Sequence, residues 1–335
     1  MSNFKEIVKQ LYSHDEKPPK TIKIFDTKDH QPISIQDYQI FAKDDVICKN
    51  SIYLAWKPVK DIKSEKYSCY AFKTTHFDKD IDRTIEDWKK KVENEYHLVQ
   101  QFEHNQFIIH YKDLIDCDNT TKYIVMDWFP YPDLFEYWCD HPIMKEPFIQ
   151  RILYQTLSAL ESLHQRNIVH NDIKLDNLLI KSINPVHVVL TDFENAVPIE
   201  ECELNNYGSA LFMAPEICEG IQHNTEADIW AVGILAHLLF VGKPPFNLKA
   251  FSSVKHTREM LGRHQLDERL MKNNMSLLAF KLVKSMLNRD PQKRISAADA
   301  LKDPYFKGLK EIINNELFSG NDIDLHDNNA VRDQK

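Results

Sequence analysis

The spacing of apolar residues changes along this chain, and the change restricts the fold more than any other feature. Between residues 36 and 130 the apolar runs are short and rich in β-branched or aromatic residues, as in "SIYLAW", "YSCYAF" and "KYIVMDWF". One helical stretch, residues 83–103, interrupts them. From residue 145 the apolar residues recur at helical spacing, as in "EPFIQRILYQTLSALESLHQ". We predict an α+β fold with a small, mostly antiparallel β lobe containing one main helix, followed by a larger, mostly helical lobe.

The two ends of the chain are predicted to lie outside this fold. Residues 1–35 form an extension in which "FKEIVKQLY" has the spacing of a short amphipathic helix, followed by two prolines. Residues 307–335 form a tail with a weak helix near 309–318. Beyond that helix the tail is polar and rich in Asn and Asp, so we expect it to be partly disordered.

Composition excludes several classes of function. The formal net charge is −8 and the longest basic run is Lys89 to Lys91, which argues against a nucleic-acid partner. The six cysteines form no C-x-x-C pair, which suits a reducing compartment, so an intracellular location, cytoplasmic or nuclear, is expected. No signal-peptide core and no apolar run of roughly 18 residues is present, so no membrane association is predicted.

The stretch "HNDIKLDNLLI", residues 170–180, sets Asp172, Lys174 and Asn177 at offsets typical of a phosphate-transfer loop. "LTDFENAV", "MAPE" and "ADIWAVG" follow it in order. As an ordered set these motifs resemble the eukaryotic protein kinase family, serine/threonine type. The resemblance covers residues 36–306 and implies a bilobal kinase fold, with a small lobe at 36–126, a hinge at 127–131 and a large lobe at 132–306.

The resemblance implies a role for each residue of the catalytic loop. Asp172 would orient the substrate hydroxyl and accept its proton, and Lys174 would stabilise the transferring phosphoryl group. Asn177 and Asp192 would hold magnesium ions, which take oxygen ligands and bridge the phosphates of ATP.

Lys73, in "YAFK", matches the strand lysine that holds the α- and β-phosphates of ATP in this family. Its glutamate partner is predicted to be Glu95. Glu93 is the close rival, but Glu95 has apolar neighbours at helical spacing that turn its face inward, namely Leu98, Val99 and Phe102.

The resemblance also implies an adenine site. Met126 stands at the gatekeeper position, and Asp127 to Phe129 would offer backbone groups to the base. An apolar slot suits a purine face, and its lining would come from Ile52, Ala71 and Leu179. Packing in the core is the alternative for these three side chains and is compatible with the adenine role.

Two departures from the family pattern concern the nucleotide and metal. Alignment of "SIYLAW" puts Asp45, Ile47 and Asn50 where glycines of the phosphate-binding loop belong, so weaker ATP binding is expected. "DFE" replaces the usual DFG, which places Glu194 beside Asp192. Glu194 points either to solvent or to the metal, and in the second case Mn²⁺ would be favoured beside Mg²⁺.

A third departure concerns regulation. Asn171 replaces the arginine that in many kinases clamps a phosphate on the activation loop. Here that loop, residues 194–208, contains no Ser or Thr. The arginine and its partner are missing together, which predicts a non-RD kinase whose loop is ordered without phosphorylation.

Lys174 and Ser209 resemble the serine/threonine branch, so the expected partner is a protein with a Ser or Thr acceptor. Asp133 and Asp176 stand where some relatives keep acids that receive a substrate arginine, which would favour a basic substrate; a ribose contact and a helix cap are the alternatives. Arg294 is expected to pair structurally with Glu216 of "MAPE".

The alternative to an ATP-dependent kinase is a pseudokinase that acts as a nucleotide-binding or scaffold module. The sequence does not indicate an oligomeric state.

Overall fold

The computed structural model describes residues 33–36, 38–40, 52–58, 67–79, 81–82, 84–202, 211–243, 245 and 266–318. The helix expected in residues 4–12, the loop with Asp45, Ile47 and Asn50, the positions Tyr207 and Ser209, and the tail beyond 318 lie outside the described residues. The chain divides into two compact units. The first takes in Met1–Gln101, Ile109–Pro130 and Ile312–Lys335, and the second takes in Phe102–Ile108 and Tyr131–Glu311.

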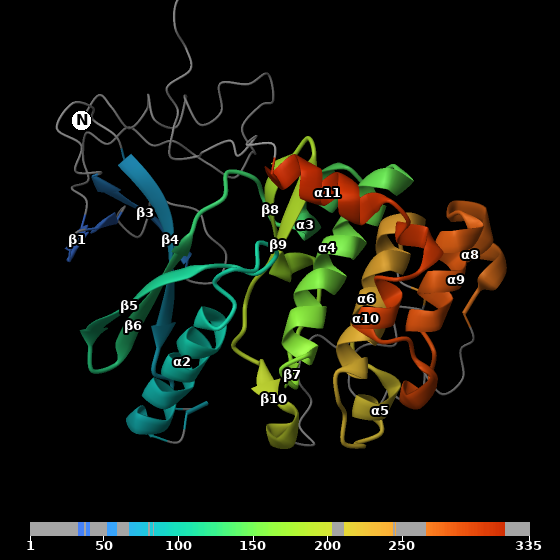
Figure 1. Ribbon diagram of the computed structural model, residues 1–335. Helices are drawn as coiled ribbons and strands as arrows, with labels where there is room; N and C mark the ends of the chain where they lie inside the picture. The colour runs from blue at the N-terminus through green and yellow to red at the C-terminus, as the bar shows by residue number, and fades with distance from the viewer. Residues whose placement is uncertain are drawn as a thin grey trace, which may run out of the picture. The chain divides into compact units, whose positions relative to one another are not determined.

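The first unit contains an antiparallel sheet of six strands in the order β1-β2-β3-β4-β6-β5 (Figure 1). Phe72, Ile115 and Val125 form a buried apolar cluster on this sheet. The strands are β1 (Ile33–Ile35), β2 (Tyr38–Ile40), β3 (Ile52–Pro58), β4 (Tyr67–His76), β5 (Tyr111–Asp118) and β6 (Thr121–Asp127).

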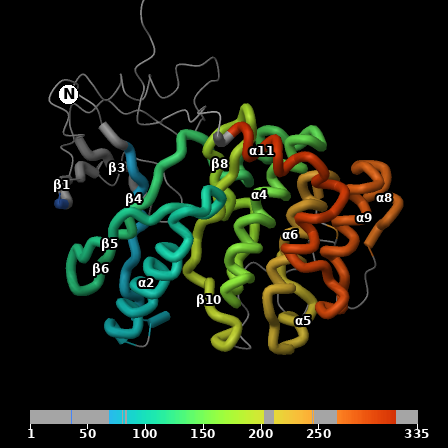
Figure 2. The backbone as a smooth tube through the Cα atoms, viewed as in Figure 1, coloured from blue at the N-terminus to red at the C-terminus, as the bar shows by residue number. Residues whose placement is uncertain are grey.

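Helix α2 (Ile85–Gln100) packs against β5 in the same unit (Figure 2). It begins at Thr84, whose hydroxyl accepts a hydrogen bond from the Asp87 N–H at 3.0 Å. Four residues of this helix are buried and follow one another at spacings of three or four residues, so they form a single face. They are Trp88, Val92, Glu95 and Val99.

The second unit is mostly helical. Helix α4 contacts the short hairpin strand β9 and helix α6, and it lies between them in Figure 1. The α-helices among the described residues here are α3 (Leu134–Asp140), α4 (Glu146–His164), α5 (Pro215–Cys218), α6 (Glu226–Val241), α8 (Glu268–Asn274), α9 (Leu277–Met286), α10 (Ala297–Ala300) and, continuing into the first unit, α11 (Leu309–Phe318). The strands are β7 (Ile168–Val169) paired with β10 (Val197–Pro198), and β8 (Leu178–Ile183) paired with β9 (Val186–Leu190).

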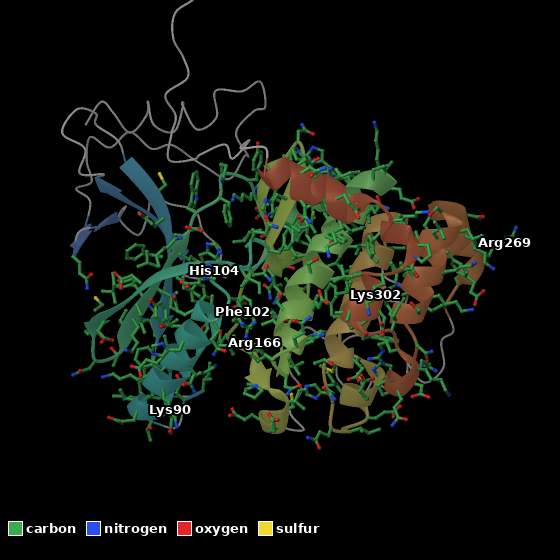
Figure 3. All side chains as sticks on the ribbon, viewed as in Figure 1. Lys90, Phe102, His104, Arg166, Arg269 and Lys302 are labelled. Carbon is green, nitrogen blue, oxygen red and sulfur yellow. The ribbon has the colours of Figure 1, made fainter. Side chains whose placement is uncertain are left out.

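Helix α6 forms the core of this unit because it is apolar on every side and is buried from Ala227 to Leu239. Gly233 lets α6 approach the end of α9, since a Cβ atom at this position would lie 2.8 Å from the Leu287 side chain. At the other side of the unit, the guanidinium of Arg166 stacks over the ring of Phe102 at 4.6 Å, and Figure 3 shows the two labelled side chains together.

The buried pair expected between Arg294 and Glu216 is confirmed. Both guanidinium Nη atoms bond the carboxylate, at 2.6 and 2.9 Å, and the Arg294 Nη1 atom also donates to the Glu226 carbonyl. Arg294 therefore joins α5 to the first residue of α6. Ser296 caps helix α10, because its hydroxyl accepts a hydrogen bond from the Asp299 N–H.

The predicted α+β class is confirmed, with the antiparallel sheet and α2 in one unit and the helical part in the other. Among the described residues, no helix combines the length and apolar character that a bilayer crossing needs.

Candidate active site

A lysine and a glutamate are paired in the first unit. Lys73 lies on β4, and its Nζ atom is 3.0 Å from Oε1 of Glu95 on α2. Both side chains are largely withdrawn from water, with 15% and 4% of their surface exposed, so the pair is screened less than a surface ion pair. Glu95 faces inward because it shares the buried stripe of Trp88, Val92 and Val99.

The rival glutamate has a different partner. Glu93 Oε1 accepts from Lys122 Nζ at 3.0 Å, and the same ammonium lies 2.5 Å from Asp116. Tyr111, which the sequence did not single out, donates its hydroxyl to Glu95 Oε1 at 2.7 Å. The structure therefore joins Lys73 to Glu95 and holds the carboxylate from a second side.

In the second unit the loop after β7 is fixed by a carboxylate from α6. The backbone N–H groups of His170 and Asn171 donate to Asp228 Oδ2 and Oδ1, at 2.9 and 3.0 Å. His164 Nε2 lies 2.9 Å from the same Oδ2. Burial alone would raise the pKa of Asp228, but the hydrogen bonds and the charge of His164 hold it below its usual range.

Within this loop three predicted residues meet at one oxygen atom. Asp172 Oδ2 accepts from Lys174 Nζ at 2.6 Å and from Asn177 Nδ2 at 3.0 Å. Among the described residues no donor contacts the other carboxylate oxygen, Oδ1. The carboxylate is thus oriented through one oxygen, while the second is left as an acceptor.

The residues expected to hold metal have suitable donor atoms. Both hydrogen bonds of Asn177 to Asp172 use Nδ2, so its amide is turned with the carbonyl oxygen Oδ1 away from that carboxylate. Asp192 follows β9 and adopts a left-handed backbone conformation, with φ of 64°. Within the described ranges no group of three or more His, Cys, Asp or Glu side chains could hold a metal ion. This donor set fits Mg²⁺, which takes one or two protein oxygens and completes its shell with phosphates and water.

Ala71 and Met126 lie directly opposite each other on β4 and β6, and both are buried. Cross-strand partners of this kind point to the same face of a sheet. Ile52 begins β3 and is in register with Lys73.

The chain that follows Met126 is oriented by contacts in the same unit. Asp127 donates its N–H to the His110 carbonyl. Burial opposes ionisation of Asp127, but His110 and Lys112 lower the pKa of its carboxyl below the usual value. Phe129 follows at a half-buried position.

Leu179 and Asp133 lie together in the second unit, joined by an isolated β-bridge. Leu179 is half-buried on β8. Asp133 is the N-cap of α3, where Oδ1 accepts from the Glu136 N–H at 2.9 Å. Asp176 is exposed, and so is Glu194, which is the orientation expected if Glu194 points to solvent.

The comparisons with known proteins agree with this fold. A family model described as "Protein kinase domain" matches residues 58–306. Mouse serine/threonine-protein kinase ULK3 is 31% identical over 223 residues, covering 65% of this chain and 46% of the relative. Serine/threonine-protein kinase PLK4 of Drosophila willistoni is 33% identical over 169 residues, covering 48% of this chain and 20% of the relative. The crystal structure of the Rad53 kinase domain and SCD2 is 25% identical with a TM-score of 0.63, over 81% of this chain and 89% of that one.

The chain belongs to the protein kinase family, because the matched segment takes up most of its length. The chain spans about half the length of the mouse ULK3 relative. It spans a smaller share, 20%, of the PLK4 relative.

Several residues around the site were not found from the sequence. Asp228 lies in the quoted "ADIWAVG" stretch but carries no local sign of its contact with residues 170 and 171. Tyr111 and His223 stand outside every motif. In the first unit Tyr111 contacts Glu95, and in the second unit His223 contacts Asn171, each across a long stretch of chain.

Proposed function

We propose that the chain is a serine/threonine protein kinase that transfers the γ-phosphoryl group of ATP to a protein hydroxyl. The observation that carries this proposal is the contact of Lys174 and Asn177 with a single oxygen of Asp172. That geometry leaves Asp172 Oδ1 to accept a hydrogen bond from the substrate hydroxyl and to take its proton as the new O–P bond forms. The bond between the γ-phosphorus and the β-phosphate oxygen breaks as the new bond forms, and ADP is the leaving group.

The charged residues have distinct proposed roles in this reaction. Lys174 would neutralise negative charge on the transferring group as well as orient Asp172. Asn177 and Asp192 would bind Mg²⁺, which when bound offsets the phosphate charge. Lys73 would bind the α- and β-phosphates, and Glu95 would hold Lys73 in place.

The apolar residues would bind the base. Ala71 and Met126 share a face of the first unit's sheet, and we assign them with Ile52 to adenine. The backbone of Asp127 to Phe129 would supply polar contacts; because the Asp127 N–H already bonds His110, its carbonyl is the group we assign to adenine. Leu179 is assigned to adenine from the second unit and Asp133 to ribose. Exposed Asp176 remains the candidate for contact with a substrate arginine.

A phosphoryl-transfer assay with purified protein, radiolabelled ATP, Mg²⁺ or Mn²⁺ and generic protein acceptors tests this function. Asp172→Asn should lower transfer by roughly 10²–10⁴-fold, because it removes the proton acceptor but keeps the side-chain volume. Asp176→Asn is the matched control, since it changes an exposed aspartate of the same loop and should leave transfer to a non-basic acceptor near wild type. Equal transfer by the wild type and Asp172→Asn would contradict the role of Asp172, and transfer by the wild type at background level would indicate a pseudokinase. Phosphoamino-acid analysis of the product would reveal whether Ser and Thr are the acceptors.

A further inference from the structure

The side chain of Asn171, at the position where many kinases carry arginine, is hydrogen-bonded at both ends of its amide. Nδ2 donates to the Asn195 carbonyl at 3.0 Å, and Oδ1 lies 2.9 Å from His223 Nε2. Asn171 and His223 are both buried. The backbone at Asn171 is left-handed, with φ of 65°, a conformation that asparagine tolerates better than most side chains.

The side-chain amide of Asn171 determines which ring nitrogen of His223 carries the hydrogen. Because Nδ2 is directed to a carbonyl, the acceptor end of the amide faces the ring, and Nε2 of His223 must be the donor. Burial lowers the pKa of His223, although Asp228 and Glu216 oppose this shift. The ring is therefore neutral near pH 7, in the tautomer with hydrogen on Nε2.

The same amide holds the beginning of the activation segment. Asn195 directly follows "DFE", and a few residues later β10 pairs with β7. The Ile199 N–H then donates to the Asn167 carbonyl at 2.8 Å. Cys202 ends this stretch as a buried thiol whose pKa is raised to about 11 by burial, so it too is uncharged near pH 7.

The uncharged contacts of Asn171 with Asn195 and His223 order the loop in a different way from an arginine. A buried guanidinium needs an anion beside it, which a loop phosphate can supply. A buried amide needs only donors and acceptors, and Asn171 already has them in Asn195 and His223. The ordering contact is therefore part of the unmodified chain.

We propose that His223 is a positioning residue: its hydrogen bond to Asn171 orients the amide that holds Asn195, and so fixes the catalytic loop and the first part of the activation segment, residues 193–202, without a phosphate. The kinetic part of this inference rests on the proposed kinase function. The structural part, ordering of residues 193–202, does not.

The test compares three variants of the full chain. His223→Leu removes the donor, whereas His223→Gln keeps an N–H at nearly the same reach as Nε2. His237→Leu is the matched control, because His237 is an equally buried histidine of the second unit that bonds the Lys243 carbonyl and does not contact Asn171. This control separates loss of the hydrogen bond between His223 and Asn171 from general destabilisation.

The first measurement is amide hydrogen exchange in residues 195–202, which include the Ile199 N–H. His223→Leu should accelerate exchange there by roughly tenfold relative to His237→Leu, as expected for loss of a buried hydrogen bond with its partner left unsatisfied. His223→Gln should remain within about twofold of the wild type. Equal exchange in His223→Leu and the wild type, or equal acceleration in both leucine variants, would overturn the proposal.

The second measurement is steady-state transfer. His223→Leu should lower kcat by roughly tenfold and leave the KM for ATP unchanged, since Lys73 and Glu95 are untouched, and His223→Gln should restore most of kcat. Adding Asn171→Ala to His223→Leu should cause little further loss if the two residues act as a pair. Additive losses, or a change in KM alone, would contradict the positioning role. If the wild type transfers no phosphate, the proposed function fails and hydrogen exchange decides the inference by itself.

Discussion

Lys73 Nζ lies 3.0 Å from Glu95 Oε1, joining strand β4 to helix α2 across 22 positions of the chain. Tyr111 donates to the same oxygen of Glu95. In the first unit, phosphate binding would depend on this pair. The neighbouring acid on α2, Glu93, has its own partner in Lys122, so it provides a control for Glu95.

Lys73→Met should abolish phosphoryl transfer while the protein remains folded, because it removes the charge proposed to bind phosphate and little core volume. Glu95→Gln should also reduce kcat/KM for ATP, by roughly 10-fold or more, since Lys73 loses the anion that holds it. Glu93→Gln is the matched control and should stay near wild type. These values come from initial rates over a range of ATP concentrations; a larger loss for Glu93→Gln than for Glu95→Gln would contradict the assignment.

The buried ion pair between Arg294 and Glu216 should matter for stability. Arg294→Ala leaves the carboxylate of Glu216 buried without its two charged hydrogen bonds, which should lower the free energy of unfolding by about 3–5 kcal/mol. Lys293→Ala removes only an exposed pair with Asp290 and should leave the free energy of unfolding close to the wild-type value. Urea denaturation followed by circular dichroism would measure both, and similar losses in the two variants would disprove the structural role of the pair.

Stability should fall with acid partly because of His237. Burial lowers the pKa of this ring and outweighs the hydrogen bond to the Lys243 carbonyl, which acts in the opposite direction. The native state therefore binds fewer protons than the unfolded chain, in which the pKa is about 6.5, so the contribution is present above that pH and is lost as the pH falls below it.

His237→Gln should make the Tm less dependent on pH between about 7 and 5, because the side chain no longer has to remain neutral in the folded state. His104→Gln, at a position with 96% of the side chain exposed, serves as the control and should leave the slope unchanged. Thermal melts of the wild type and both variants across this range would decide, and an unchanged slope in His237→Gln would rule out this linkage.

Activity is predicted to be independent of phosphorylation in the activation loop. Residues 194–208 contain Tyr207 as their one hydroxyl, close in sequence to Glu200, Glu201 and Glu203. A phosphate on Tyr207 would add negative charge near these acids without the usual arginine to receive it, so repulsion is expected.

Protein made in bacteria and treated with phosphatase should transfer phosphate as fast as untreated protein, and Tyr207→Phe should keep most of the activity. Rates before and after treatment, with mass spectrometry of residues 194–209, give the answer. A loss on treatment that is reversed by phosphorylation in that segment would show that another cation takes the place of the missing arginine.

The sequence determined the parts of the fold and site that depend on short-range spacing. Asp172, Lys174 and Asn177 belong to one turn of chain, so their order alone predicts that they can meet. Helical spacing of Glu95 with its apolar neighbours predicted that its side chain faces inward, where the structure places it.

Only the tertiary structure decided which distant residues complete the site. Asp228 lies 57 positions from Asn171 and His223 lies 52 positions from it, yet both contact it. Tyr111 reaches Glu95 because β5 packs beside α2. No local pattern encodes these contacts, since burial of apolar surface brings the elements together and the buried polar groups must then find partners among whatever residues arrive. For this reason the sequence showed that position 171 holds Asn where many kinases carry arginine, whereas only the fold showed which groups the Asn171 side chain contacts.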